Sequence, residues 1–216
     1  MNTVALIINF NRLTLPVKMA EWLSERGCTP IFIDNKSDYP PLLDYYREEH
    51  FQVLRLPANY GHTALWQYPI LKELGIVDRF IYTDPDLDLE GVPDDFVEVL
   101  NRGLNKYPGY DKCALSLEIK DLPDTHEGRY IKHGPEKPYW DKPLDSMYFH
   151  ADTDTTIALY RYPIGQYGHS AIRTNRPYTC RHLPWYYASF EDLTEDEQYY
   201  YRTANNSCSH KNRFMK

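Results

Sequence analysis

Residues 3–10, TVALIINF, decide how the rest of the sequence is interpreted. The run is apolar along nearly its whole length, which is typical of a β-strand that is covered on both faces. Asn11 and Arg12 follow it directly, and a helical pattern then begins near Thr14 and stops at Gly27. A buried strand that leads into a helix is the repeating unit of an α/β fold.

The same unit recurs through the first half of the chain. Further strands are expected at 30–34, 52–56, 79–84 and 113–119, and further helices at 41–49, 62–74 and 93–105. Strands that alternate with helices imply right-handed crossovers. The sequence therefore predicts an α/β, Rossmann-like fold, with a mostly parallel central sheet flanked by helices.

The alternation is lost in the second half, where a smaller mixed region is expected. Residues 121–147 are rich in Pro, Asp, Lys and Gly and indicate a long loop with little regular structure. Residues 157–161, IALYR, are typical of a strand. Thr194 and Glu197 have the spacing of a capping box and predict a short helix from there. The polar residues 205–216 indicate a frayed tail or the start of a linker.

The length favours one domain. At about 150 residues per domain, 216 residues suggest a single unit over 1–204, which the change in pattern divides into halves at 1–110 and 111–204. The four cysteines form no CxxC pair, which argues against a disulfide framework and fits a reducing cytoplasm.

The charge limits the partners. The chain has 24 basic and 31 acidic residues, a net charge of −7, and no basic stripe, so nucleic acid is disfavoured as a partner. An anionic ligand would need a metal ion or local cations to offset this charge. No apolar run reaches 18 residues, so no membrane span is expected.

Polar and acidic residues follow four of the expected strands. Ligands of parallel sheets bind at the carboxyl ends of the strands, where such residues meet. They are Asn11 and Arg12 after the first strand, Asp34 at the end of the second, Asn59 and Gly61 after the third, and Asp84, Asp86 and Asp88 after the fourth.

The TDPDLD segment, residues 83–88, is the most specific of these features. Carboxylates that point into one small volume repel each other unless a divalent cation lies between them. Mn²⁺ or Mg²⁺ would take one or two of them and complete its shell with phosphate oxygens and water. The alternative is a solvated acidic turn that precedes the helix at 93–105.

The order of these segments resembles glycosyltransferases of the GT-A fold, close to family 2 and to its bacterial and viral branch. The resemblance covers roughly residues 3–202 and implies a nucleotide-binding half at 1–110 and an acceptor-side half at 111–204. It is carried by INFNR (8–12), IDNKSD (33–38), LPANYGHTALW (56–66), IYTDPDLDL (81–89, with a DxD motif), DTDTTIALYR (152–161) and RPYTCRHLPWY (176–186).

The resemblance implies a site for a nucleotide diphosphate sugar, most often a UDP-sugar. Asn11 and Arg12 would line the nucleotide pocket, and Asp34 would contact the base or ribose. Asn59 and Gly61 match the family's Asn-x-Gly turn, where the missing side chain lets the backbone approach the nucleotide.

It also implies the metal ligands. Asp84 would contact the ribose or the metal, Asp86 would bind the metal, and His182 matches a C-terminal histidine that completes the metal shell in many GT-A enzymes. A neutral imidazole is a suitable ligand for Mn²⁺. The alternative for His182 is an ordinary packing role, and the other histidines show no ligand spacing.

The catalytic base is where the sequence departs from the family. Many members carry a Glu-Asp pair before the acceptor helix, whereas this chain reads TDTTIA at 153–158. Asp154 is the candidate base, with Asp152 as the second choice. The alternative is that Asp154 only orders a turn through side-chain to backbone hydrogen bonds.

The expected activity is that of a metal-dependent hexosyltransferase that moves a sugar from a nucleotide diphosphate sugar to a glycan or another hydroxyl acceptor, with inversion. A retaining transferase of the same fold and a non-catalytic sugar- or nucleotide-binding module are the alternatives. A nucleotidyltransferase is disfavoured because a Gly-rich, basic phosphate loop is missing after the first strand.

Overall fold

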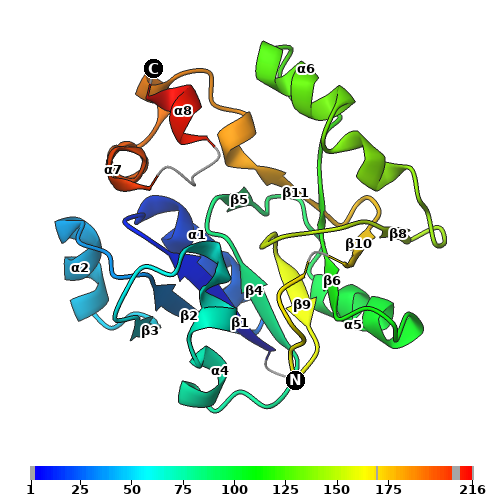
Figure 1. Ribbon diagram of the computed structural model, residues 1–216, viewed down its shortest axis with the longest axis horizontal. Helices are drawn as coiled ribbons and strands as arrows, with labels where there is room; N and C mark the ends of the chain where they lie inside the picture. Colours follow the sequence, from blue (N-terminus) through cyan, green and yellow to red (C-terminus); the bar gives the residue numbers. More distant parts are fainter. Residues whose placement is uncertain (1–2, 169, 206–209, 216) are drawn as a thin grey trace.

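The computed structural model describes residues 3–168, 170–205 and 210–215, and the fold is α/β. Its main sheet has eight strands among these residues, in the order β3-β2-β1-β4-β9-β6-β10-β8 (Figure 1). The strands are β1 (Thr3–Asn9), β2 (Cys28–Asp34), β3 (Gln52–Arg55), β4 (Phe80–Thr83), β6 (Lys112–Ala114), β8 (Tyr148–His150), β9 (Ala158–Tyr160) and β10 (Ile172–Thr174).

The sheet is mostly parallel, as the sequence predicts. Strands β3, β2, β1, β4, β6 and β10 run in one direction, whereas β9 is antiparallel to β4 and β6, and β8 is antiparallel to β10. A second, mixed sheet has the order β5-β11-β7 and is made of β5 (Leu87–Asp88), β11 (Thr179–His182) and β7 (Ser116–Leu117).

Helices flank the main sheet on both faces (Figure 1). They are α1 (Thr14–Glu25), α2 (Pro40–Arg47), α3 (Ala64–Gln67), α4 (Ile70–Glu73), α5 (Phe96–Lys106), α6 (His126–His133), α7 (Glu195–Thr203) and α8 (Lys211–Phe214), with 3₁₀ turns η1 (Gly61–Thr63), η2 (Lys137–Trp140), η3 (Leu183–Trp185) and η4 (Phe190–Asp192). None of the helices in the described residues is long and apolar enough to cross a membrane.

The continuous apolar run of β1 is explained by burial on both faces. Ala5 and Ile7 pack into one core cluster with residues of α1 and α5, while Leu6 and Ile8 pack into a second with residues of α3 and α4. All four side chains are at most 5% exposed. The expectation of a strand covered on both faces is thus confirmed.

Several expected boundaries were wrong for local reasons. The helix expected at 62–74 is interrupted at Tyr68, which is extended because Pro69 follows it. The strand expected at 113–119 is divided between β6 and β7. The helix expected from residue 93 begins at Phe96.

The second half has more regular structure than its composition indicates. Residues 121–147 contain α6, whose first turn is capped by the hydroxyl of Thr125 on the backbone N–H of Gly128 at 3.0 Å, and also η2. The capping box expected at Thr194 does not form: Thr194 makes no capping bond, and Glu197 turns inward to Arg12.

The expected frayed tail at 205–216 contains α8. Phe214 is 7% exposed and its ring lies 4.8 Å from that of Tyr201, so apolar packing holds this segment. Residues 206–209 and 216, which were part of the same expectation, lie outside the described residues.

Candidate functional site

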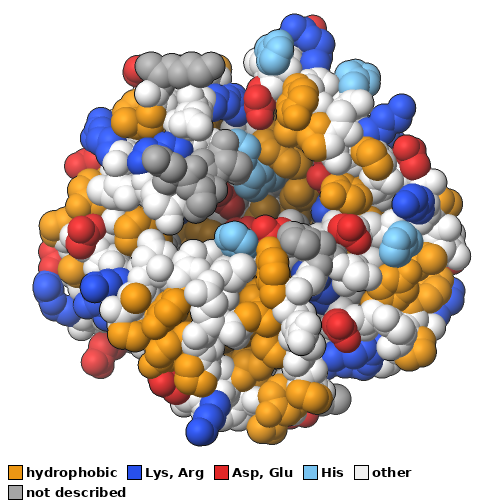
Figure 2. Space-filling view, in the orientation of Figure 1, with side chains coloured by type: hydrophobic (Ala, Val, Ile, Leu, Met, Phe, Trp, Pro, Cys, Tyr) orange, Lys and Arg blue, Asp and Glu red, His pale blue; other side chains and the backbone are white. Residues whose placement is uncertain are grey.

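A cavity of about 310 Å³ lies at the carboxyl ends of β1 and β4, where ligands of parallel sheets bind. Figure 2 shows this face hollowed near its middle, with acidic and histidine side chains around the hollow. Its wall includes Asn9, Arg12, Asn35, Asn59, Gly61, His62, Asp84, Asp86, Asp154, Thr155, His182, Tyr200, Tyr201, Asn205 and His210.

Most residues proposed from the sequence line this cavity together. They are Arg12, Asn59, Gly61, Asp84, Asp86, Asp154 and His182. Gly61 has φ +62, a conformation that favours glycine, and a Cβ there would meet no other atom within 4 Å. Backbone conformation is therefore sufficient to explain why this position is glycine.

Asp86 is the centre of the charged groups. It is 7% exposed, and its two oxygens face different partners: Oδ2 lies 2.9 Å from Nη1 of Arg12, and Oδ1 lies 3.6 Å from Nε2 of His182. Burial alone would raise the pKa of Asp86, but Arg12 and then His182 outweigh it and hold that pKa well below its ordinary value. The Asp86 side chain is therefore ionised.

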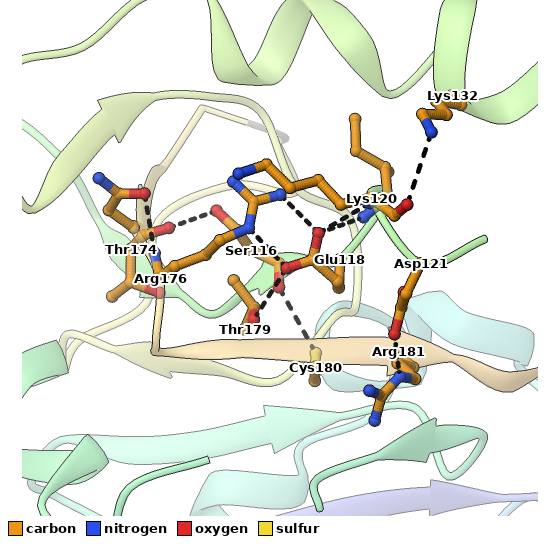
Figure 3. A network of polar contacts seen from close by, with 12 residues as sticks. Ser116, Glu118, Lys120, Asp121, Lys132, Thr174, Arg176, Thr179, Cys180 and Arg181 are labelled. Carbon is orange, nitrogen blue, oxygen red and sulfur yellow. Dashed lines mark hydrogen bonds and ion pairs between the residues drawn. The ribbon is translucent and has the colours of Figure 1, made fainter. Parts of the chain in front are cut away.

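Strand pairing brings His182 to Asp86. In the small sheet, His182 of β11 is opposite Leu87 of β5, the residue after Asp86. Figure 3 shows how β11 is held: Arg176 binds Glu118 through Nε at 2.6 Å, and Nε of Arg181 lies 2.6 Å from Asp121. These ion pairs link β11 to the chain after β7 and so fix the position of His182.

Arg12 lies between two carboxylates. Besides Asp86, it faces Glu197 of α7, with Nε and Oε1 3.0 Å apart, and its guanidinium lies 3.7 Å from the ring centre of Tyr200. Burial raises the pKa of Glu197 to about 7, although Arg12 acts to lower it. The spacing Thr194-x-x-Glu197 had suggested a helix cap, so sequence reasoning missed this contact.

Asp84 is held by the loop before β9. Its backbone N–H donates to the carbonyl of Thr155 at 2.9 Å, and the Thr155 hydroxyl donates to its carboxylate. Burial, and next the charge of Asp86, raise the pKa of Asp84 well above its ordinary value. Burial and the neighbouring Asp86 carboxylate therefore favour the protonated form of Asp84, and an added cation would act in the opposite direction.

Asp154 lies at the mouth of the cavity. Its side chain is 45% exposed, the hydroxyl of Tyr167 donates to Oδ1 at 2.8 Å, and Nε2 of His62 is 4.0 Å from Oδ2. Lys112 donates to the Asp154 carbonyl at 3.0 Å, which fixes the backbone while the carboxylate stays accessible. Asp152 is exposed and is not part of the cavity wall, so of the two candidate residues Asp154 is the one that lines the cavity.

Asn11 and Asp34 are not in the cavity wall. The amide of Asn11, which has φ 55, accepts from the backbone N–H groups of Asp38 and Tyr39 and so shapes the loop after β2. Asp34 is fully buried and bound to Nε of Arg55 at 3.0 Å. Both side chains are engaged within the protein, and their expected role as nucleotide contacts stays a prediction that this cavity does not support.

The neighbouring Asn35 lines the cavity instead. Its amide donates to the carbonyl of Gly61 at 3.0 Å and accepts from the N–H of Tyr60 at 3.1 Å. It thereby joins the loops after β2 and β3. Asn35 directly follows the last residue of a buried strand, and this position in the sequence is typical of a residue that lines a ligand site.

His62 and His210 are cavity residues that sequence reasoning had set aside. The His210 ring centre lies 5.2 Å from that of His182, and burial, followed by the charge of His182, lowers the pKa of His210 to about 4. The contact joins β11 to the segment at α8, and no short-range pattern indicates it.

The residues fit a divalent cation in part. Among the described residues, Oδ1 of Asp86 and Nδ1 of His182 are buried and have no hydrogen-bond partner, and Oδ1 of Asp86 faces the other ring nitrogen of His182. No group of three or more His, Cys, Asp or Glu side chains in the described chain is arranged to hold a metal. Two protein ligands leave positions for phosphate oxygens and water, as in many Mg²⁺ sites.

A scan against protein-family models and a search of curated proteins gave no match to this chain.

Proposed function

We propose that this chain is a glycosyltransferase of the GT-A type, which moves a sugar from a nucleoside diphosphate sugar to an acceptor hydroxyl. One observation carries the proposal. Asp84, Asp86, Asp154 and His182 come from distant parts of the sequence and yet line one cavity at the carboxyl ends of parallel strands. This is the combination that such a transfer requires: a place for a charged leaving group beside a place for a base.

The nucleoside diphosphate would occupy the cavity. A volume of about 310 Å³ is at the small end of ligand pockets. The exposed amide of Asn59 in the cavity wall offers a polar contact for the nucleoside, with uracil as the first candidate base. The diphosphate would then lie near Asp86 and His182.

The cavity has little positive charge available for a diphosphate. Arg12 is already paired with Asp86 and Glu197, so it leaves little positive charge for a diphosphate. Mn²⁺ or Mg²⁺ held by Oδ1 of Asp86 and Nε2 of His182 would supply positive charge to the leaving diphosphate. Arg12 keeps Asp86 ionised and oriented, and Asp84 provides a second carboxyl group beside it.

Asp154 would act as the general base. Tyr167 orients its carboxylate, and the acceptor would approach from the mouth of the cavity. The acceptor oxygen gives its proton to Asp154 and bonds to the anomeric carbon, while the bond from that carbon to the diphosphate oxygen breaks. Attack opposite the leaving group inverts the anomeric configuration.

Donor turnover tests the proposal. Purified protein is incubated with a panel of nucleoside diphosphate sugars and Mn²⁺, and release of nucleoside diphosphate is measured. We expect release with at least one donor and a loss of about 100-fold or more in Asp86→Asn. Asp88→Asn is the matched control, because Asp88 lies two residues away and outside the cavity wall. Equal rates in parent and Asp86→Asn would refute the role of Asp86.

The base is tested separately. Asp154→Asn should slow transfer by about 10²–10⁴-fold, while thermal stabilisation by UDP with Mn²⁺ persists. The anomeric configuration of the product, determined by NMR, should be inverted. A product with retained configuration would remove Asp154 from this role.

A further inference from the structure

Tyr167 and His62 lie beside Asp154 at the mouth of the cavity, and Trp66 packs against Tyr167. The ring centre of Tyr167 lies 4.9 Å from that of Trp66 and 6.0 Å from that of His62. Tyr167 is 37% exposed, and its hydroxyl binds Oδ1 of Asp154. We call Tyr167, Trp66 and His62 the aromatic rim.

Contacts of Trp66 with a neighbouring loop and with the core hold the rim in place. The indole N–H of Trp66 donates to the carbonyl of Gly165 at 3.2 Å, which ties the loop that carries Tyr167 to α3. The Trp66 ring also packs edge-on against Tyr82 and Tyr160, which are buried in the core. The Tyr167 ring is therefore a preorganised surface beside the candidate base.

The charges near the rim disfavour an anionic ligand. Of the described residues that line the cavity, Arg12 is the one Lys or Arg, and it is buried between two carboxylates. Lys112 and Arg161 line a second cavity together with Trp66, but each donates to a backbone carbonyl. Asp154 itself would repel a phosphate or carboxylate. A ligand at this place must offer hydroxyl groups to Asp154 and an apolar face to Tyr167, and carry no negative charge of its own.

We propose that the aromatic rim is a binding site for a neutral carbohydrate, which stacks its C–H face on Tyr167 and gives a hydroxyl to Asp154. The use of this carbohydrate as sugar acceptor rests on the proposed function, but its binding does not. Trp185, a second aromatic residue near the charged groups, is 7% exposed and packs edge-on against His182, so it offers no such face.

Binding is measured without any donor. Neutral tetrasaccharides of glucose, galactose, mannose and N-acetylglucosamine, and the acidic tetragalacturonate, are titrated at millimolar concentration and followed by saturation-transfer NMR. We expect at least one neutral tetrasaccharide to bind. Tyr167→Ala should weaken that binding about 3- to 10-fold, whereas Tyr167→Phe, which keeps the ring, should bind within about 2-fold of the parent.

Tyr130→Ala is the matched control, because Tyr130 is an exposed tyrosine on α6, outside the cavity wall and the aromatic rim. It should bind like the parent. The proposal is overturned if no neutral tetrasaccharide binds, if Tyr167→Ala binds as well as the parent, or if tetragalacturonate binds more tightly than every neutral probe.

The two proposals fail in distinguishable ways. Absence of nucleoside diphosphate release with every donor, together with Tyr167-dependent saccharide binding, would reject the transferase and keep the carbohydrate site. Release of nucleoside diphosphate to water, with no saccharide bound, would keep donor cleavage and reject the site.

Discussion

Replacement of Arg12 by methionine is the sharpest test of how the charged cluster is built. Arg12 is 4% exposed, with Asp86 at 2.9 Å, Glu197 at 3.0 Å and the Tyr200 ring at 3.7 Å. Methionine keeps much of the volume but leaves two buried carboxylates without their cation. Removal of one partner from a buried ion pair costs about 3–5 kcal/mol. For a chain of this length the melting temperature should fall by about 6–20 °C.

Urea unfolding followed by circular dichroism gives the free energy of unfolding directly. The double variant Arg12→Met/Glu197→Met should recover about half of the loss, because one of the two carboxylates is then gone. Arg26→Met is the matched control: Arg26 pairs with the exposed Asp94 and should lose at most about 1 kcal/mol. A loss in Arg12→Met no larger than in the control would refute the buried cluster.

Three further variants test charged groups in and around the cavity. Burial raises the pKa of Glu197 to about 7, so between about pH 4.5 and pH 7 the folded protein holds a proton that the unfolded chain has released. The free energy of unfolding therefore falls as the pH rises through this range. Glu197→Gln should remove this decrease when unfolding by urea is measured across the same range. The pKa of His210 is lowered to about 4, so the free energy of unfolding falls as the pH drops from about 6.5 to about 4. In His210→Gln the melting temperature should decrease less steeply over this pH range than in the parent. Asp196 accepts three hydrogen bonds of 2.7–2.9 Å from the first residues of α1, so Asp196→Ala should lose about 2 kcal/mol in urea unfolding; an unchanged midpoint would contradict this capping role.

Strands β1 to β4 were predictable because their signal is local, whereas the short strands β5, β8, β10 and β11 were not expected. A run such as residues 3–10 is apolar whichever residues surround it, and the observed β1 ends within one residue of the expected strand. Two features that the prediction missed also have a local sequence signal. Pro69 marks the end of a helix at the residue before it, and Thr125 precedes a sequence that forms α6.

The cavity was predictable only in part. Asp86 and His182 were expected on a resemblance of motifs, and the structure brings them together through the pairing of β5 with β11. Glu197 and His210 were missed because their role depends on contacts with residues far away in the sequence. A buried glutamate at the start of a helix has the same local pattern as a capping residue, and only the position of Arg12 distinguishes the two.

Helix α7 shows why the C-terminal segment belongs to the site. Two consecutive residues of α7 contact the loop after β1: Asp196 caps the start of α1, and Glu197 binds Arg12. Arg12 in turn holds Asp86, so the position of α7 and the charge on Asp86 depend on each other. Tyr200 covers the same guanidinium from one turn further along α7. Any ligand that draws Arg12 away from Asp86 must therefore also change how α7 is held, which couples the occupancy of the cavity to the stability of the C-terminal segment.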